Sequence, residues 1–238
     1  MRALRLLFPL IVAAALITGC GGKPATSTPP APTTAAEAFA GKSANEIATS
    51  AIAALKAAPS VRMKGTVNNN GQKMTIDLKY NRAKDGEGTI SADGQTMQLM
   101  KIGEDHYLKA DDELVATIVG DDKNVATLVK GKWLKGTSSD LGMVVGLLFG
   151  LADQVLNDPP TGLSRGATGV INGVKALALT GEVADGFDKV WVATEGEPYP
   201  LRLDAGADGA VDFTEYGATL NLTAPPASEV VDLSKLGS

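Results

Sequence analysis

Regular alternation of apolar and polar residues most constrains the fold of this chain. Between Lys73 and Tyr80, apolar side chains occupy every second position, and Lys, Thr and Asp fill the positions between them. Successive side chains of a β-strand point to opposite faces, so this pattern predicts a strand with one apolar face and one wet face. The turn signals Asn70-Gly71 and Asp93-Gly94 separate it from further alternating segments. Together these features predict an antiparallel meander.

The same pattern recurs along most of the chain and predicts about ten or eleven strands. In one of them, Met100 and Ile102 fall on the face opposite Met97 and Leu99, which predicts either a bulge or a second covered surface. The expected strands are Val61–Val67, Lys73–Tyr80, one around Ile90, one through Met97 and Leu99, His106–Lys109, Lys132–Lys135, Val174–Glu182, Lys189–Thr194, Tyr199–Asp204, Val211–Tyr216 and Thr219–Thr223. Glu229–Leu233 is expected to lie across the folded body.

Three regions have helical spacing instead. Ser43 and Glu46 form a capping box before an apolar stripe from Ile47 to Leu55, and Pro59 ends that helix. Asp111–Lys130 has helical spacing with a break at Gly120, and Asp140–Asn157 forms a further helix before a pair of prolines. Strands with inserted helices predict an α+β fold.

The N-terminus has the features of an export signal. Arg2 and Arg5 precede an apolar run from Leu6 to Ile17, which suits the apolar region of a signal peptide and is too short to span a bilayer. The run ends in Ile17-Thr18-Gly19-Cys20, which resembles the lipobox of bacterial lipoproteins. This resemblance implies cleavage after residue 19 and a diacylglyceryl group on Cys20, the only cysteine in the chain. The alternative is an ordinary secretory signal with an incidental thiol.

Three parts of the chain follow from this interpretation. Residues 1–19 are the signal peptide. Residues 20–42 carry the lipidated cysteine and a Pro/Thr-rich stretch that is too poor in large apolar residues to form a core, so we expect a disordered tether. Residues 43–238 form one domain. The expected location is the outer face of the cell membrane, with attachment through the lipid on Cys20.

Composition excludes several classes of function. One cysteine and one histidine rule out a disulfide framework, a multi-cysteine zinc site and a metal site with several imidazoles. A net charge of −5 argues against a nucleic-acid partner. The aromatic content of 5% is too low for the stacking platforms that bind sugars or single-stranded bases.

Five stretches follow one another along the chain after the capped helix: Ser60–Val67, His106–Asp111, Gly131–Lys135, Gly196–Arg202 and Pro225–Leu233. Their order resembles that of the LppX/LprG-type lipoproteins of actinobacteria, within the LolA/LolB-like superfamily. This resemblance implies a strongly curved antiparallel sheet, a half-barrel, with helices packed in its concave face and an apolar cavity between them. It also implies a lipid or lipoglycan ligand, for which an envelope export partner is possible. No convergent set of titratable groups stands out in the sequence, so we expect no cofactor and no catalysis.

Candidate cavity residues are chosen for apolar alternation alone, and core packing is the competing explanation for them. They are Met74, Ile76, Leu78, Met97, Leu99, Leu148, Val190, Val192, Leu201 and Leu203. A further clue is the segment 141–152, which is apolar on all sides and has Gly142, Gly146 and Gly150 at every fourth position. Such a helix must be buried or must face lipid, so it either packs tightly on the sheet or forms a lid.

Other motifs point only weakly to function. Asp204–Glu215 has the acidic spacing of a calcium loop, but the prolines before it and the alternation after it favour a hairpin turn. His106 is expected to be a solvated turn residue, and Trp133 and Trp191 to be core anchors. Three hypotheses therefore remain: a lipid-binding lipoprotein, a non-catalytic envelope interaction or sensor module with a filled core, and, third, an enzyme.

Overall fold

The computed structural model describes residues 39–69, 71–119, 123–137, 141 and 160–235. The chain divides into two units, residues 1–32 and 33–238, and every described residue belongs to the second. The predictions for the signal peptide, for Cys20, for most of the tether and for the helix through 142–157 lie outside the described residues. No helix within the described residues has both the length and the apolar character needed to cross a membrane.

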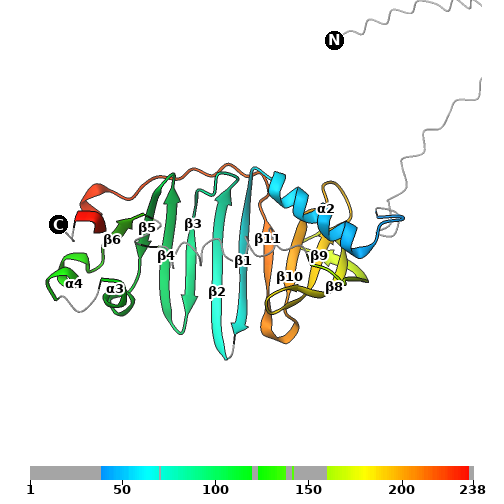
Figure 1. Cartoon of the computed structure of the whole chain (residues 1–238), viewed down its shortest axis with the longest axis horizontal. Helices are drawn as coiled ribbons and strands as arrows, with labels where there is room; N and C mark the ends of the chain where they lie inside the picture. The colour runs from blue at the N-terminus through cyan, green and yellow to red at the C-terminus, as the bar shows by residue number, and fades with distance from the viewer. Residues whose placement is uncertain (1–38, 70, 120–122, 138–140, 142–159, 236–238) are drawn as a thin grey trace, which may run out of the picture. The chain divides into compact units, whose positions relative to one another are not determined.

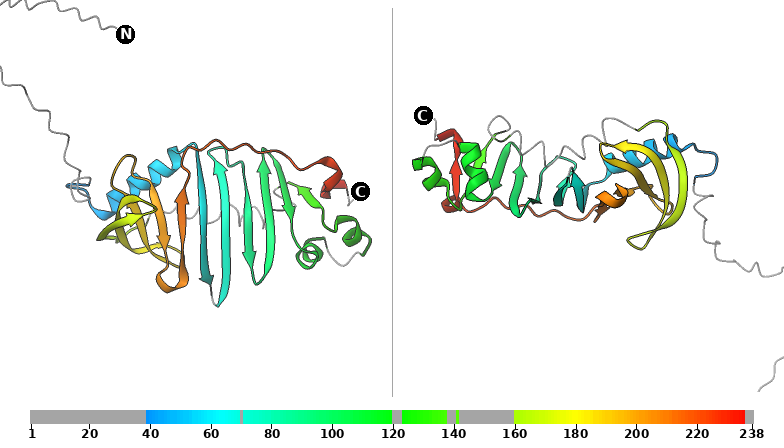
Figure 2. Two further views of the ribbon diagram at one scale, coloured as in Figure 1. Left: turned by 180° about the vertical axis from the view of Figure 1, so that it is seen from behind. Right: turned by 90° about the horizontal axis from the view of Figure 1, so that it is seen from below.

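The described residues fold around one sheet of 12 strands. The sheet is curved and unclosed, with β12 and β7 at its two edges (Figures 1 and 2). Its order is β12-β6-β5-β4-β3-β2-β1-β11-β10-β9-β8-β7. The strands are β1 Ser60–Asn69, β2 Gln72–Asn81, β3 Gly86–Ala92, β4 Gln95–Ile102, β5 Asp105–Lys109, β6 Trp133–Gly136, β7 Ser164–Ile171, β8 Val174–Ala184, β9 Phe187–Ala193, β10 Pro200–Asp204, β11 Gly209–Thr214 and β12 Val230–Asp232.

The sheet consists of two meanders that meet at one seam. In the first, β1 to β6 pair in sequence order, and in the second, β7 to β11 do the same. The seam is the antiparallel pair β1–β11, in which Met63 lies opposite Phe213. All neighbours are antiparallel except β12, which runs parallel to β6. The predicted α+β class is therefore confirmed. The parallel pair of β6 and β12 was not expected from the predicted antiparallel meander.

Helix α2, Ala44–Ala57, begins with the predicted capping box. Ser43 Oγ accepts a hydrogen bond from the Glu46 amide at 3.3 Å, and the Glu46 carboxylate accepts one from the Ser43 amide at 2.7 Å. These bonds satisfy amide groups that a helix N-terminus otherwise leaves without partners. The helix buries Ile47, Ala48, Ala51 and Leu55 in the main hydrophobic core, and it contacts β7, β9 and β10.

Two short helices lie between β5 and β6 in the sequence. They are α3, Asp112–Val119, and α4, Lys123–Val129, as the predicted break at Gly120 requires. Val115 of α3 and Val129 of α4 are buried in the same core as α2.

The main core covers one face of the sheet, here called the inner face. A row of inner-face residues crosses the first meander from strand to strand, each directly opposite the next. This row is Phe213, Met63, Leu78, Gly88, Leu99, Leu108 and Leu134. The six side chains of this row are at least 98% buried, and Gly88, which has no side chain, is partly exposed.

The opposite, outer face is largely charged and polar. It carries a network in which Arg62 contacts Asp77 and Glu215, Lys64 contacts Asp77, and Lys79 contacts Glu215. Beyond the seam this face holds a second hydrophobic cluster, which consists of Ile171, Ala176, Ala193 and Leu201 with Val174 and Trp191.

Three details of the strand prediction were wrong. β7 was not predicted, and Thr219–Thr223 forms no strand. Glu229–Leu233 was expected to lie across the body, and part of it instead joins the sheet as β12. The bulge considered near Met100 is absent, since β4 pairs with β3 and β5 in unbroken register; irregularities occur instead in the pairs of β7–β8, β8–β9 and β9–β10.

Candidate functional site

A pocket of about 410 Å³ lies on the inner face, at the ends of the strands near the seam. β2 contributes Met74 and Ile76, β1 contributes Val67, and Phe187 and Val211 come from the second meander. Its other described lining residues are Asn68, Asp185, Gly186 and Ala205. The volume is within the range of small-ligand pockets, and the walls are mainly apolar with few polar groups, as such pockets usually are.

The structure places only two of the ten predicted cavity residues in this pocket, Met74 and Ile76. Leu78, Leu99, Val190, Val192 and Leu203 are buried in the packed core, and Met97 packs against it. Leu201 belongs to the second cluster, because the irregular pairing between Pro200 and Arg202 removes it from the alternation that places Leu203 in the main core. Leu148 lies outside the described residues.

The sequence did not single out the residues that complete the pocket. Phe187 and Gly186 belong to the turn between β8 and β9, and Ala205 follows β10. The Asp185-Gly186 turn signal located this hairpin, but only the pairing of β1 with β11 brings it near Met74.

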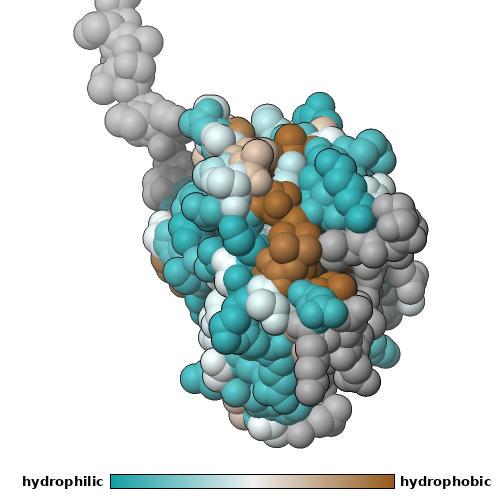
Figure 3. Space-filling view, turned by 90° about the vertical axis from the view of Figure 1, so that its left-hand side faces the viewer, coloured by the Kyte–Doolittle hydropathy of each residue, from teal (hydrophilic) through white to brown (hydrophobic). Residues whose placement is uncertain are grey.

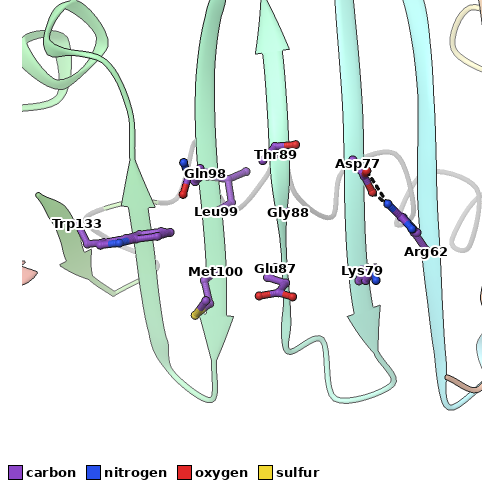
Figure 4. A pocket seen from close by; sticks show the side chains of 10 residues that line it. All are labelled: Arg62, Asp77, Lys79, Glu87, Gly88, Thr89, Gln98, Leu99, Met100 and Trp133. Atoms are coloured by element: carbon purple, nitrogen blue, oxygen red, sulfur yellow. Dashed lines mark hydrogen bonds and ion pairs between the residues drawn. The ribbon is translucent and has the colours of Figure 1, made fainter. Parts of the chain in front are cut away.

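A second hollow, of about 360 Å³, lies on the outer face; it is called here the outer groove (Figure 4). It extends over strands β1 to β4 and is bounded by β6. Its described lining is Arg62, Asp77, Lys79, Glu87, Gly88, Thr89, Gln98, Leu99, Met100 and Trp133.

Arg62 holds the charges at one end of the outer groove together. Its Nε and Nη2 each donate to an Asp77 carboxylate oxygen at 2.7 Å, and its Nη1 donates to Glu215 at 2.6 Å. These bonds, together with Lys64 on Asp77 and Lys79 on Glu215, hold the pKa of both carboxyl groups below their usual values. The network fixes side chains on β1, β2 and the residue after β11.

Trp133 is half-buried on the outer face, where it lines this groove. The prediction that it anchors the core was therefore wrong, because its neighbour Leu134 takes the inner position. Its indole points from β6 toward Gln98 and Met100 (Figure 4), and the Lys109 ammonium lies 6.0 Å from the ring centroid. Trp191 packs against the second cluster, and its Nε1 donates to Asp204 at 3.4 Å.

His106 is buried, which contradicts the prediction of a solvated turn residue. It lies in β5 with 3% exposure, and within the described part of the chain neither ring nitrogen has a hydrogen-bond partner. Burial lowers the pKa of its imidazole, and the nearby Lys101 lowers it further. Glu104 and Asp105, which suggested a solvated turn, precede a residue that faces the core.

The segment Asp204–Glu215 forms a hairpin, as predicted. β10 and β11 flank the short 3-10 helix η1, Gly206–Asp208, and Asp204 lies opposite Ala210 across the two strands. Among the described residues, no group of three or more His, Cys, Asp or Glu side chains is arranged to hold a metal ion.

Hydrophobic side chains also reach the surface at one end of the sheet. Figure 3 shows a stripe of them between hydrophilic residues, on the side of the molecule where α3, α4 and β6 lie in Figure 1. Among the described residues, the large hydrophobic side chains that are clearly exposed are Leu128 of α4 and Val170 of the edge strand β7.

No protein-family model and no curated protein matches this chain. Among solved structures, it is similar to the lipoprotein LppX of Mycobacterium tuberculosis, with 17% identity, a TM-score of 0.47, and coverage of 76% of this chain and 98% of that one. It is also similar to LprF of Mycobacterium bovis, with 15% identity, a TM-score of 0.44, and coverage of 76% and 96%. A conserved protein from Thermus thermophilus matches at 12% identity and a TM-score of 0.37, with coverage of 79% and 98%.

Proposed function

We propose that this protein is an extracytoplasmic lipoprotein that binds the acyl chains of a lipid or lipoglycan in the inner-face pocket. The observation that carries the proposal is the pocket of about 410 Å³ between the two meanders, with Val67, Met74, Ile76, Phe187 and Val211 on its walls. Apolar ligand surface removed from water contributes about 25 cal/mol per Å², and these walls offer few polar groups that would select a headgroup.

The N-terminal sequence supports the location. A lipid on Cys20 would attach the protein to the outer face of the cell membrane, and the Pro/Thr-rich tether would let the folded domain reach the bilayer surface. A diacylglyceryl group has two chains, which is what stable anchoring requires. An envelope export partner that receives the lipid belongs to the same proposal.

The experiment is mass spectrometry of lipids that co-purify with a Cys20→Ser variant, whose own acylation is abolished, from its native host. Acyl lipids are expected in the purified protein. Met74→Trp should reduce their amount several-fold, because the larger side chain fills the pocket. Lys73→Trp is the matched control. Lys73 is exposed, and as the residue next to Met74 in β2 it points to the opposite face of the sheet, away from the pocket. Protein free of lipid, or equal amounts of lipid in the two tryptophan variants, would contradict the proposal.

One observation favours the second candidate, a non-catalytic interaction or sensor module. The side chains of the inner row are packed with almost no exposure, and six of the ten predicted cavity residues, Ile76 among them, are buried in that same core. A module of this kind would keep its interior filled and would use its outer surfaces for recognition. The lipid experiment separates the two, because the module should purify without an acyl ligand.

A further inference from the structure

The outer groove differs from both the packed core and an ordinary solvated sheet face. It is a hollow of about 360 Å³ where polar side chains of β2, β3 and β4 meet the apolar Met100 and Trp133 (Figure 4). It lies on the face of the sheet opposite the inner pocket. An inference from it therefore does not rest on the proposed lipid binding.

The charges that line the outer groove cancel. Arg62 and Lys79 are balanced by Asp77 and Glu87. Arg62 is already bound to Asp77 through two hydrogen bonds of 2.7 Å, and Lys79 is 3.1 Å from Glu215. A groove without net charge, whose cations already have partners, has no electrostatic preference for a phosphate or an acidic peptide.

Three polar side chains in the outer groove are free to bind. The side chains of Glu87, Thr89 and Gln98 have no hydrogen bond or ion pair with any described residue. Thr89 lies directly opposite Gln98 across β3 and β4, and Glu87 lies opposite Met100 in the same pair of strands. A carboxylate, a hydroxyl and a carboxamide thus form one array that can both accept and donate hydrogen bonds.

Trp133 supplies a flat apolar wall beside this array. The indole ring points from β6 toward Gln98 and Met100, and Lys109 lies on one side of it at 6.0 Å. A bound molecule would therefore meet an aromatic wall and, next to it, unsatisfied hydrogen-bonding groups. Few neutral molecules offer both a ring with an apolar C–H face and a rim of hydroxyl groups, and saccharides are the general case.

We propose that the outer groove binds a neutral saccharide chain. One sugar ring packs against the Trp133 indole, and its hydroxyl groups hydrogen-bond with Glu87, Thr89 and Gln98. The low aromatic content of the chain argues against a long stacking platform, but a site for one ring needs a single indole. Met100 completes the apolar wall, and the Arg62–Asp77 pair closes the groove at the opposite end.

The test uses the fluorescence of Trp133 itself. The chain has two tryptophans, so Trp191→Phe leaves Trp133 as the only one. This protein is titrated with maltohexaose, cellohexaose and mannohexaose, each up to about 10 mM, because a single-ring site is expected to bind in the millimolar range. At least one of the three should give a saturable change. Gln98→Ala and Glu87→Ala should each weaken that binding about three- to tenfold, as loss of one hydrogen bond does.

Thr96→Ala is the matched control. Thr96 is exposed on the same face of β4, two residues from Gln98, and does not line the outer groove. It should bind the saccharide like the parent protein, and all variants should keep the parent thermal unfolding midpoint within a few degrees. Absence of a saturable change with all three sugars would overturn the proposal, as would equal binding by the Gln98 and Thr96 variants. A neutral serine–glycine hexapeptide is titrated in parallel, and binding of this peptide without any sugar would assign the groove to peptides instead.

Discussion

Gly88 lies directly opposite Leu78 across β2 and β3, and a Cβ atom at Gly88 would come within 2.6 Å of Leu78 Cδ2. The same atom would lie 2.4 Å from the Asp77 carbonyl oxygen, which belongs to the backbone and cannot turn away. The glycine therefore lets β3 approach β2 closely within the inner row.

We expect Gly88→Ala to lower the free energy of unfolding by about 1–3 kcal/mol, because backbone shifts in a packed core cost about that much. Gly166→Ala in the edge strand β7 is the matched control. Its Cβ would meet the side chains of Ala178 and Thr180 at 3.2 Å and the Ala178 carbonyl oxygen at 3.3 Å, distances that shifts of a few tenths of an ångström relieve. Urea unfolding of the two variants measures the difference. Equal stabilities would show that β3 can move away from β2.

The Arg62 network should make stability depend on acid pH. Because Arg62 lowers the pKa of Asp77 and Glu215 below their usual values of 3.8 and 4.5, the unfolded chain binds protons first as the pH falls. The stability from these groups is thus fully present above about pH 4.5 and is lost below it. In Arg62→Gln, urea unfolding between pH 5 and pH 3 should show a smaller loss than in the parent protein. Lys175→Gln, which breaks the exposed ion pair with Glu195, should lose as much unfolding free energy between pH 5 and pH 3 as the parent protein does.

His106 should produce a separate pH effect at higher pH. Its folded pKa lies below the usual 6.5, so protons bind preferentially to the unfolded chain, and stability falls as the pH drops below about 6.5. It is the only histidine in the chain, and the usual carboxyl values lie well below this range. The difference in unfolding free energy between pH 7.5 and pH 5.5 should therefore become much smaller in His106→Leu. A variant that kept the parent difference would assign the effect to another group.

Cys20→Ala should release the protein from membranes. We expect the parent protein to sediment with membranes and the variant to appear in the soluble fraction, because the folded domain is acidic and has no charge attraction to an anionic leaflet. Replacing Thr18 with Ala is the control, since small residues suit the positions before a lipidated cysteine. Sedimentation of the Cys20 variant with membranes would instead indicate anchoring by another part of the chain.

Local patterns in the sequence were sufficient to predict the first meander and the first helix. Alternation placed Ile76 and Leu78 on the inner face, and the Asp93-Gly94 turn connects β3 and β4 as expected. The capping box at Ser43 forms with both of its hydrogen bonds. In each case, the signal and the structure it produces lie within a few residues of each other.

Features that depend on distant strands were not predictable in this way. β7 is mostly exposed and contains two glycines, so it shows no alternation, and its pairing with β8 defines it as a strand. Leu201 leaves the main core because of one irregular step in β10. His106 has acidic neighbours at a turn, yet β6 and the inner face bury it.

The candidate site was only partly predictable for the same reason. Of the predicted cavity residues, Met74 and Ile76 line the inner-face pocket, but Phe187 and Ala205 join them there only through the seam between the meanders. The outer groove was missed because alternation assigns Glu87, Thr89 and Gln98 to a wet face and says nothing of hollows on it. A tryptophan beside several polar residues on that face is the one signal that could have indicated it.

The seam between β1 and β11 also has a consequence for the export that we propose for this chain. Each meander can assemble from neighbouring segments of the chain. The second edge of β1, however, can pair only when β11, which contains Phe213, has been made available. Closing so long a loop is the slow step in such a topology. A chain threaded N-terminus first through a membrane pore would therefore stay incompletely folded until almost all of it has crossed. That delay would keep the chain competent for translocation. It would also leave the apolar inner face exposed to chaperones and lipids until the seam forms.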